Sequence, residues 1–101
     1  MAVKDKRLEP IHPGEILLEE FMKPLGISIN KLAGDIAVPP GRISALVNRK
    51  RAVTADTALR LGKYLGVSPE VWMGLQAEYD LRVAQRVIGP EVERVVRRRA
   101  A

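Results

Sequence analysis

Apolar residues recur along this chain at the spacing of helix faces. Between residues 28 and 36, one face carries apolar positions at i, i+3, i+4 and i+7, namely Ile29, Leu32, Ala33 and Ile36. Val38-Pro39-Pro40 then interrupts the period, because proline cannot continue a helix and disfavours helical geometry in the residue before it. Apolar spacing resumes at Ile43, Leu46 and Val47. The stretch Ser28–Asn48 therefore predicts two short helices joined by an abrupt bend.

Helix starts follow the same plan through the rest of the chain. An apolar residue precedes each start, and a partner lies five positions later, as in a hydrophobic staple: Ile11 with Ile16, Ile27 with Leu32, Val38 with Ile43, Val53 with Ala58, and Val67 with Trp72. Several starts carry further signals. Ser28, Thr54 and Ser68 are expected as N-caps, and Pro13, Pro40 and Pro69 stand at the first helical position. Gly26 and Gly66 end two segments.

These signals predict an all-α, five-helix, repressor-like domain with helices at about 13–24, 28–36, 40–48, 54–65 and 69–87. Pro24 predicts a distorted last turn in the first helix, whose inward side chains are Ile16, Leu17, Phe21 and Leu25. Gly89-Pro90 is expected to end the fifth helix, leaving a short C-terminal helix or tail. The expected organisation is a flexible arm at 1–10, a helix-turn-helix domain at 11–88 and a basic tail at 89–101.

The positive charge is concentrated on the predicted helix pair. The net charge of the chain is +5. Residues 28–66 carry seven basic and two acidic side chains, whereas residues 1–27 sum to −1 and residues 67–101 to +1. A localised basic patch is typical of a protein that binds a polyanion. Helix, tight turn and second helix form the helix-turn-helix unit, whose second helix can enter the DNA major groove.

Candidate DNA contacts follow from this geometry. With Ile43 and Leu46 in the core, the outward face of the second helix is predicted to contact DNA through Pro40, Gly41, Arg42, Ser44, Ala45 and Asn48. Arg42 is the candidate for a guanine or phosphate, and the basic run Arg49-Lys50-Arg51 for phosphates. Ser28 and Asn30 open the first helix, where backbone amides favour a phosphate. Since Pro40, Gly41 and Ala45 offer few hydrogen bonds, DNA shape and dimer spacing are expected to carry much of the specificity.

Other chemistry is poorly represented. The chain has no cysteine, and its single histidine, His12, beside Pro13, is predicted to be a cap or a surface residue. With no Gly-rich phosphate loop and no cluster of metal ligands, we expect neither an enzyme nor a cofactor. Charged residues follow Met1, and no window resembles a membrane span, so a cytoplasmic protein without a secretory signal is expected. A homodimer interface is predicted within residues 67–87, at an exposed edge formed by Trp72, Leu75 and Tyr79.

The ordered combination of motifs over roughly residues 10–85 resembles the HigA-type antitoxin family, which consists of Xre-like helix-turn-helix proteins. The matching stretches are HPGEIL at 12–17, LGIS at 25–28, VPP at 38–40, RI at 42–43, VN at 47–48, KR at 50–51, TADTALRL at 54–61 and LQAEYDL at 75–81. The resemblance implies a dimer that binds palindromic operator DNA at its own promoter. It also implies neutralisation of a RelE-like toxin that cleaves mRNA.

Four positions differ from residues that are common in that family. Ile29 stands where glutamine is frequent, Ala37 where glycine is, Ser44 where asparagine is, and Arg49 where glycine is. If the turn is kept, Ala37 must adopt a left-handed conformation, at a cost of about 1–2 kcal/mol. With arginine at position 49, Asn48 is expected to take the left-handed cap position.

Two other functions are compatible with the same residues. One is a solitary Xre-type regulator without a toxin partner. The other is a toxin-binding module in which the helix-turn-helix serves only as a scaffold. Copurification with a basic protein of about 10 kDa encoded alongside distinguishes the regulator from the antitoxin, and an operator footprint distinguishes the antitoxin from the module.

Overall fold

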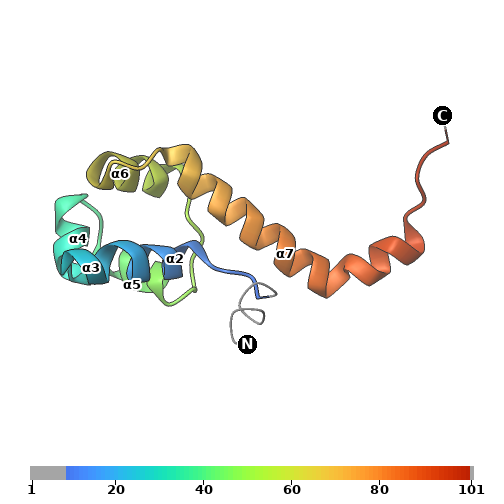
Figure 1. Ribbon diagram of the computed structural model, residues 1–101, viewed down its shortest axis with the longest axis horizontal. Helices are drawn as coiled ribbons and strands as arrows, with labels where there is room; N and C mark the ends of the chain where they lie inside the picture. Colours follow the sequence, from blue (N-terminus) through green and yellow to red (C-terminus); the bar gives the residue numbers. More distant parts are fainter. Residues whose placement is uncertain (1–8, 101) are drawn as a thin grey trace.

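A computed structural model describes residues 9–100, and in this part of the chain helices are the regular structure (Figure 1). The first helical stretch comprises α2 (Pro13–Ile16), the π-helix η1 (Leu17–Met22) and α3 (Lys23–Leu25). It is followed by α4 (Ile29–Asp35), α5 (Pro40–Val47), α6 (Ala55–Leu65) and α7 (Pro69–Val95). The predicted all-α, five-helix fold is confirmed. The predicted arm, except for Glu9 and Pro10, lies outside the described residues.

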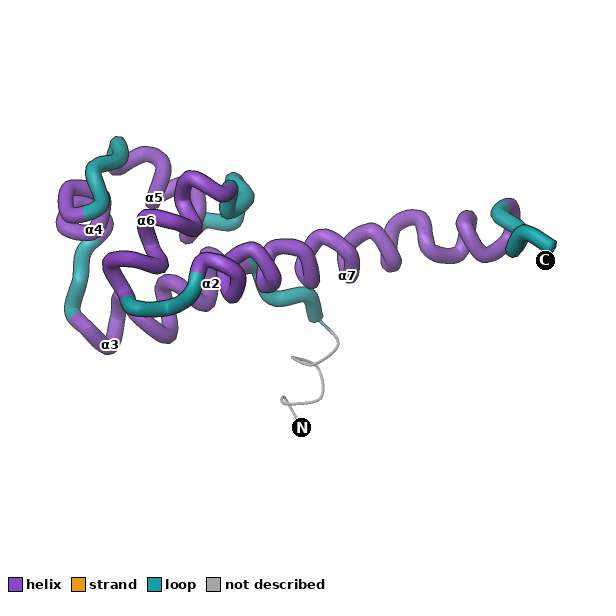
Figure 2. The backbone as a smooth tube through the Cα atoms, turned by 90° about the horizontal axis from the view of Figure 1, so that it is seen from above, coloured by secondary structure: helices purple, strands orange, loops and turns teal. Residues whose placement is uncertain are grey.

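The helices up to α6 form a cluster from which α7 projects (Figures 1 and 2). Packing pairs α4 with α5 and α6 with α7, while α2 lies against both α5 and α7. The core is aliphatic apart from one tryptophan and consists of Leu17, Met22, Leu32, Ala33, Ile36, Val38, Ile43, Leu46, Val53, Ala58, Leu61 and Trp72. Members of four predicted staples belong to this core or pack against it, whereas Ile11 is exposed. No helix in residues 9–100 is long and apolar enough to cross a membrane.

The predicted helix starts are confirmed. Ser28, Thr54 and Ser68 are N-caps whose hydroxyls accept hydrogen bonds from Lys31, Thr57 and Glu70 amides. His12 is also an N-cap, and the predicted alternative that it is a surface residue is wrong, because its side chain is buried. Each cap satisfies a backbone amide that has no partner within its helix.

The π-helix explains why the predicted inward face of the first helical stretch is wrong at its end. Pro24 has no amide hydrogen, and in an α-helix its ring would collide with the carbonyl four residues earlier. The chain widens instead, and the Lys23 amide donates to the Leu18 carbonyl, five residues back. The extra residue in the turn places Met22 in the core. Leu25, predicted to point inward, is 60% exposed.

Two helices end with a side-chain-bearing residue in the left-handed region. Ala37 and Arg49 both have φ of 61°. In each turn the left-handed residue donates to the carbonyl three residues back, and the next residue donates to the carbonyl five residues back, as in a Schellman motif. The prediction for Ala37 is confirmed. The prediction for Asn48 is wrong: Asn48 has φ of −91°, because it is the C-cap and the motif places its left-handed residue one position later.

Replacing Ala37 with glycine is therefore expected to stabilise the protein by about 1 kcal/mol, since glycine adopts positive φ without a Cβ penalty. Ala77→Gly provides the matched control, because Ala77 lies exposed within α7 and glycine there should cost about 1 kcal/mol. Chemical denaturation of both variants measures the free energy of unfolding. Equal destabilisation by the two substitutions would show that the turn carries no strain.

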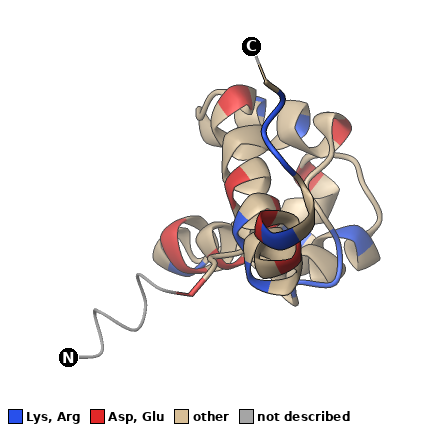
Figure 3. Ribbon diagram, turned by 90° about the vertical axis from the view of Figure 1, so that its right-hand side faces the viewer, with Lys and Arg blue, Asp and Glu red and all other residues tan. Residues whose placement is uncertain are grey.

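The last helix is longer than predicted. Gly89-Pro90 was expected to end it, but α7 continues to Val95 with Pro90 inside. Proline removes one backbone hydrogen bond and bends a helix without always ending it. Figure 1 shows α7 changing direction in its last part. Residues 96–100 follow without regular structure, and the basic run Arg97-Arg98-Arg99 is exposed there (Figure 3).

Candidate DNA interface

The second helix of the motif, α5, presents its small and polar residues away from the core. Its buried side chains are Ile43 and Leu46. Pro40, Gly41 and Asn48 are exposed, while Ser44 and Ala45 are half-buried. Residues spaced as 41, 44, 45 and 48 share one helix face. The predicted outward face is therefore a real surface of the folded chain, and its lack of long side chains allows a close approach to another molecule.

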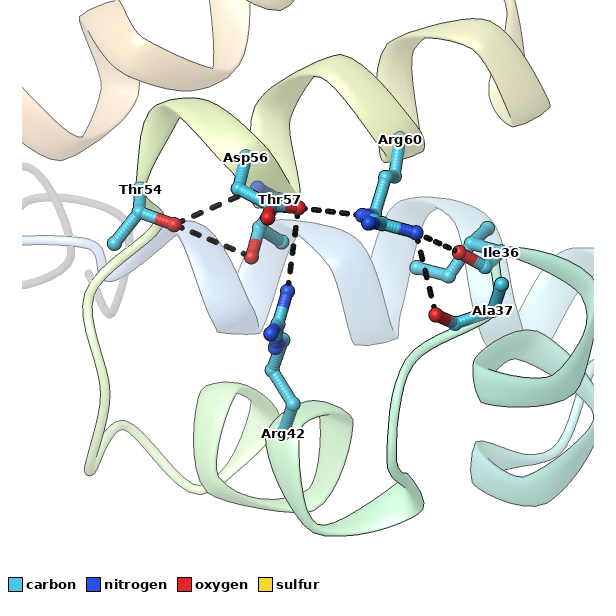
Figure 4. Close-up of polar contacts among 7 residues, drawn as sticks. All are labelled: Ile36, Ala37, Arg42, Thr54, Asp56, Thr57 and Arg60. Atoms are coloured by element: carbon cyan, nitrogen blue, oxygen red, sulfur yellow. Dashed lines mark hydrogen bonds and ion pairs between the residues drawn. The ribbon is translucent and has the colours of Figure 1, made fainter.

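Three of the predicted contact residues make side-chain hydrogen bonds or ion pairs within the protein. Asn48 turns back onto its own helix, where its Nδ2 donates to the Ser44 carbonyl at 2.8 Å. The Arg42 side chain is only 23% exposed and lies against α6, with its Nη1 3.4 Å from Oδ1 of Asp56 (Figure 4). Ser28 Oγ is occupied as a cap, accepting from the Lys31 amide at 3.0 Å, and Asn30 beside it is exposed.

Arg49, Lys50 and Arg51, hereafter the basic loop, are all exposed directly after α5. One end of this loop is tied to α2, because Arg49 Nη1 lies 3.8 Å from Glu15 Oε1. The other end is tied to α7 through the buried Gln76, whose Oε1 accepts from the Val53 amide at 2.8 Å. The backbone on both sides of the basic loop is thus held near α2 and α7, and three exposed cationic side chains follow α5 at the place where phosphate contacts are expected.

Sequence reasoning missed several residues that fix this surface. Gln76 stands in the matching stretch at 75–81 but received no role from the sequence, and only the fold brings it to Val53. Arg60 is a further case: its Nη1 donates to the carbonyls of Ile36 at 2.9 Å and Ala37 at 3.2 Å. Its Nε also donates to Asp56, and this contact lowers the pKa of the Asp56 carboxyl (Figure 4). Arg60 therefore stabilises the turn between α4 and α5 by donating hydrogen bonds to its carbonyls from α6.

His12 connects the start of α2 to the basic loop. Its Nδ1 accepts from the Gly14 amide at 2.9 Å, its ring packs edge-on against Tyr79 at 4.8 Å, and its other ring nitrogen donates to the backbone carbonyl of Arg51. Burial lowers the pKa of His12, with a smaller contribution from the positive charge of Arg49. The capping contact requires an unprotonated Nδ1, so the neutral ring belongs to the folded state.

Acid should consequently destabilise the protein through this residue. Because the pKa of His12 is lower in the folded chain, the unfolded chain takes up the proton first as pH falls below about 6.5. The stabilising contribution is complete above that pH and is lost as pH falls from 6.5 through the folded pKa. Thermal unfolding of the wild type should show that Tm decreases as pH is lowered from 7 to 5. In the His12→Asn variant, asparagine can still cap the helix but does not titrate, so Tm should depend less on pH. An equal slope of Tm against pH in both proteins would refute the role assigned to His12.

The predicted exposed edge for dimerisation is wrong in part. Trp72 is only 1% exposed, because it packs inside its own chain beside Phe21, with ring centroids 5.5 Å apart. Leu75 and Tyr79 are half-buried. The helical spacing was correct, but this edge faces α2 and the core. The exposed apolar residues of α7 lie mostly farther along, at Leu81, Val87, Ile88, Val92 and Val95.

Comparison with known proteins agrees with this arrangement. A helix-turn-helix family model matches residues 18–72. Virulence-associated protein I of Dichelobacter nodosus is 49% identical over 75% of this chain and 70% of its own length. A HigA-family addiction module antidote protein from Coxiella burnetii has a TM-score of 0.86 at 45% identity, covering 90% of this chain and 99% of that one.

The Pseudomonas aeruginosa antitoxin HigA, solved with its higBA promoter, has a TM-score of 0.86 at 39% identity, covering 88% of this chain and 97% of that one. The match of the family model extends from η1 through α4 and α5 to the start of α7, so it includes the whole candidate interface. An HTH-type transcriptional regulator of Escherichia coli is also 39% identical, over 78% of this chain and 70% of its own length, so the relatives are described as regulators and antitoxins. This chain belongs to the helix-turn-helix family and, within it, to the HigA-type antitoxins.

Proposed function

We propose that this protein binds operator DNA at its own promoter as a homodimer and neutralises a RelE-like, mRNA-cleaving toxin. The observation that carries the DNA-binding part is the joining of a small-residue helix face on α5 to the exposed basic loop at its exit. The small residues allow α5 to approach base edges, while the loop supplies phosphate contacts. A HigA protein with the same fold binds its promoter, which supports this use.

The homodimer is supported by the exposed face of α7. Leu81, Ile88, Val92 and Val95 are exposed and separated by seven, four and three residues, which places them along one side of the helix. Over 27 residues α7 is about 40 Å long, and its distal half projects from the helix cluster (Figure 2). A second copy pairing along this strip would bury the apolar side chains that the single chain leaves in water. Sedimentation equilibrium tests this, and a monomer at micromolar concentration would contradict it.

The toxin part rests on membership of the HigA-type family. We expect the protein to copurify in a stable complex with a basic protein of about 10 kDa encoded beside it, and to suppress mRNA cleavage by that protein in a purified assay. A neighbouring protein that neither binds nor cleaves RNA would favour a solitary regulator. A tight toxin complex without any operator footprint would favour the toxin-binding module.

Gel-shift titration measures the DNA part separately. A duplex from the DNA directly upstream of the gene should be bound at least 1,000-fold more tightly than a shuffled duplex of equal length, as specific operators are. Equal affinity for both duplexes at moderate salt would contradict the repressor function while leaving toxin binding open to its own assay.

A further inference from the structure

Arg42 does not project freely from the candidate interface. It stands in the first turn of α5, and its Nη1 lies 3.4 Å from Oδ1 of Asp56 in the first turn of α6 (Figure 4). An unrestrained arginine has many rotamers, and one contact near its end removes most of them. The carboxylate of Asp56 thus determines the direction in which the guanidinium leaves α5.

Asp56 is itself held in place. Arg60, one turn later on α6, donates from Nε to the same Oδ1 that Arg42 approaches. Arg60 also donates to the carbonyls of Ile36 and Ala37, at 2.9 and 3.2 Å, in the turn between α4 and α5. A continuous series of charge-assisted hydrogen bonds therefore connects that turn to the guanidinium of Arg42.

This arrangement needs an explanation, because a carboxylate beside a DNA-binding surface repels phosphates. As a phosphate contact alone, Arg42 would lose effective charge to this pairing, and more so than Arg49, whose side chain is 61% exposed and whose partner Glu15 lies 3.8 Å away. Base recognition is different, since it requires the planar guanidinium to meet two acceptors of guanine in one fixed geometry. A guanidinium that is oriented before binding loses less conformational freedom when it meets the base.

We propose that Asp56 is a positioning residue for sequence recognition, which orients Arg42 toward a guanine edge, and that Arg60 holds Asp56 in that role. The inference rests on the proposed operator binding. It assigns sequence discrimination to one side chain at the α6 edge of the small-residue face of α5, and it makes α6 part of the recognition surface.

The test is selection of bound sequences from a random duplex pool, followed by affinity measurements on the selected and a shuffled duplex. Asp56→Asn keeps the shape of the side chain and removes its charge. Asp35→Asn is the matched control, because it removes the same charge from α4, where the partners are Lys31 and Tyr64. Arg42→Ala, Asp56→Glu and the Arg42→Ala/Asp56→Asn double variant complete the set.

We expect Asp56→Asn and Arg42→Ala to lose preference at the same base pair of each half-site. The ratio of specific to nonspecific affinity should fall about tenfold for each half-site, and so about a hundredfold for the dimer. Nonspecific affinity of Asp56→Asn should not fall, because a negative charge has been removed. Asp35→Asn should retain the wild-type ratio, and Asp56→Glu most of it. The double variant should have the same ratio of specific to nonspecific affinity as Arg42→Ala alone, since the two residues act through one contact.

Two results would overturn the positioning role while leaving operator binding intact: Asp56→Asn keeping the preference that Arg42→Ala loses, or Arg42→Ala keeping it. A parallel loss of specific and nonspecific affinity in Asp56→Asn, together with a lower Tm than Asp35→Asn, would also overturn it by showing a structural role only. A wild-type protein that selects no sequence would instead contradict the proposed function itself and the positioning role with it.

Discussion

Replacing Gly14 with alanine is expected to destabilise the protein by about 3 kcal/mol, the upper part of the usual range for overpacking. A Cβ at this position would lie 1.8 Å from the carbonyl oxygen of Leu46 in α5. The position of the Cβ is fixed by the backbone, and the atom that it meets is a backbone oxygen, so no change of side-chain rotamer can relieve the clash. For a domain of this size Tm should fall by about 15 °C, which thermal unfolding followed by circular dichroism measures.

Gly34→Ala is the matched control. Gly34 lies within α4, and a Cβ there meets nothing within 4 Å. Alanine should therefore stabilise the protein by up to about 1 kcal/mol through helix propensity. If Gly14→Ala melted at the wild-type temperature, the close approach of α2 to α5 described here would be wrong, and with it the position of α5 on the domain.

Replacing the three cationic side chains of the basic loop should produce the largest effect on DNA affinity. The triple variant Arg49→Ala/Lys50→Ala/Arg51→Ala eliminates up to three phosphate contacts in each protomer, or six in the proposed dimer. Each contact contributes about 0.9 to the slope of log K against log salt, so the slope should become shallower by as much as about 5. Affinity near physiological salt should fall on the order of a hundredfold, for operator and shuffled DNA alike.

The C-terminal arginines provide a control with the same change of charge. Arg97→Ala/Arg98→Ala/Arg99→Ala removes three exposed cations beyond the end of α7, remote from α5 (Figure 1). Fluorescence anisotropy titrations between 50 and 300 mM salt compare the two triple variants. Equal slopes in these variants would show that the protein attracts DNA through overall charge and that the basic loop makes no particular contacts.

The sequence predicted the helix starts because their signals are local. Ser28, Thr54 and Ser68 act as caps through amides two or three residues away, and no distant part of the fold is needed to recognise them. The left-handed turn at Ala37 was predictable only through the resemblance to the HigA-type family, in which glycine is frequent at this position. Helix ends were less predictable, since Pro90 is tolerated inside α7 and Arg49, rather than Asn48, carries the positive φ.

The partners of side chains could not be predicted, because they depend on how helices pack. A helical face of Trp72, Leu75 and Tyr79 has the same pattern whether it contacts its own core or a second copy, and only the fold shows that Trp72 is internal. Gln76 and Arg60 look like surface residues in the sequence, yet each hydrogen-bonds to backbone more than 20 residues away. The candidate DNA residues were predictable by position, but the inward pairing of Arg42 was not.

A footprint on the DNA upstream of the gene is the most direct test of operator binding. We expect protection of two half-sites whose centres lie about 34 Å apart, one turn of the double helix, at protein concentrations that leave other DNA accessible. Protection should disappear in the basic-loop variant. Uniform protection along the fragment, or none at concentrations that saturate nonspecific binding, would show that the protein does not bind an operator there.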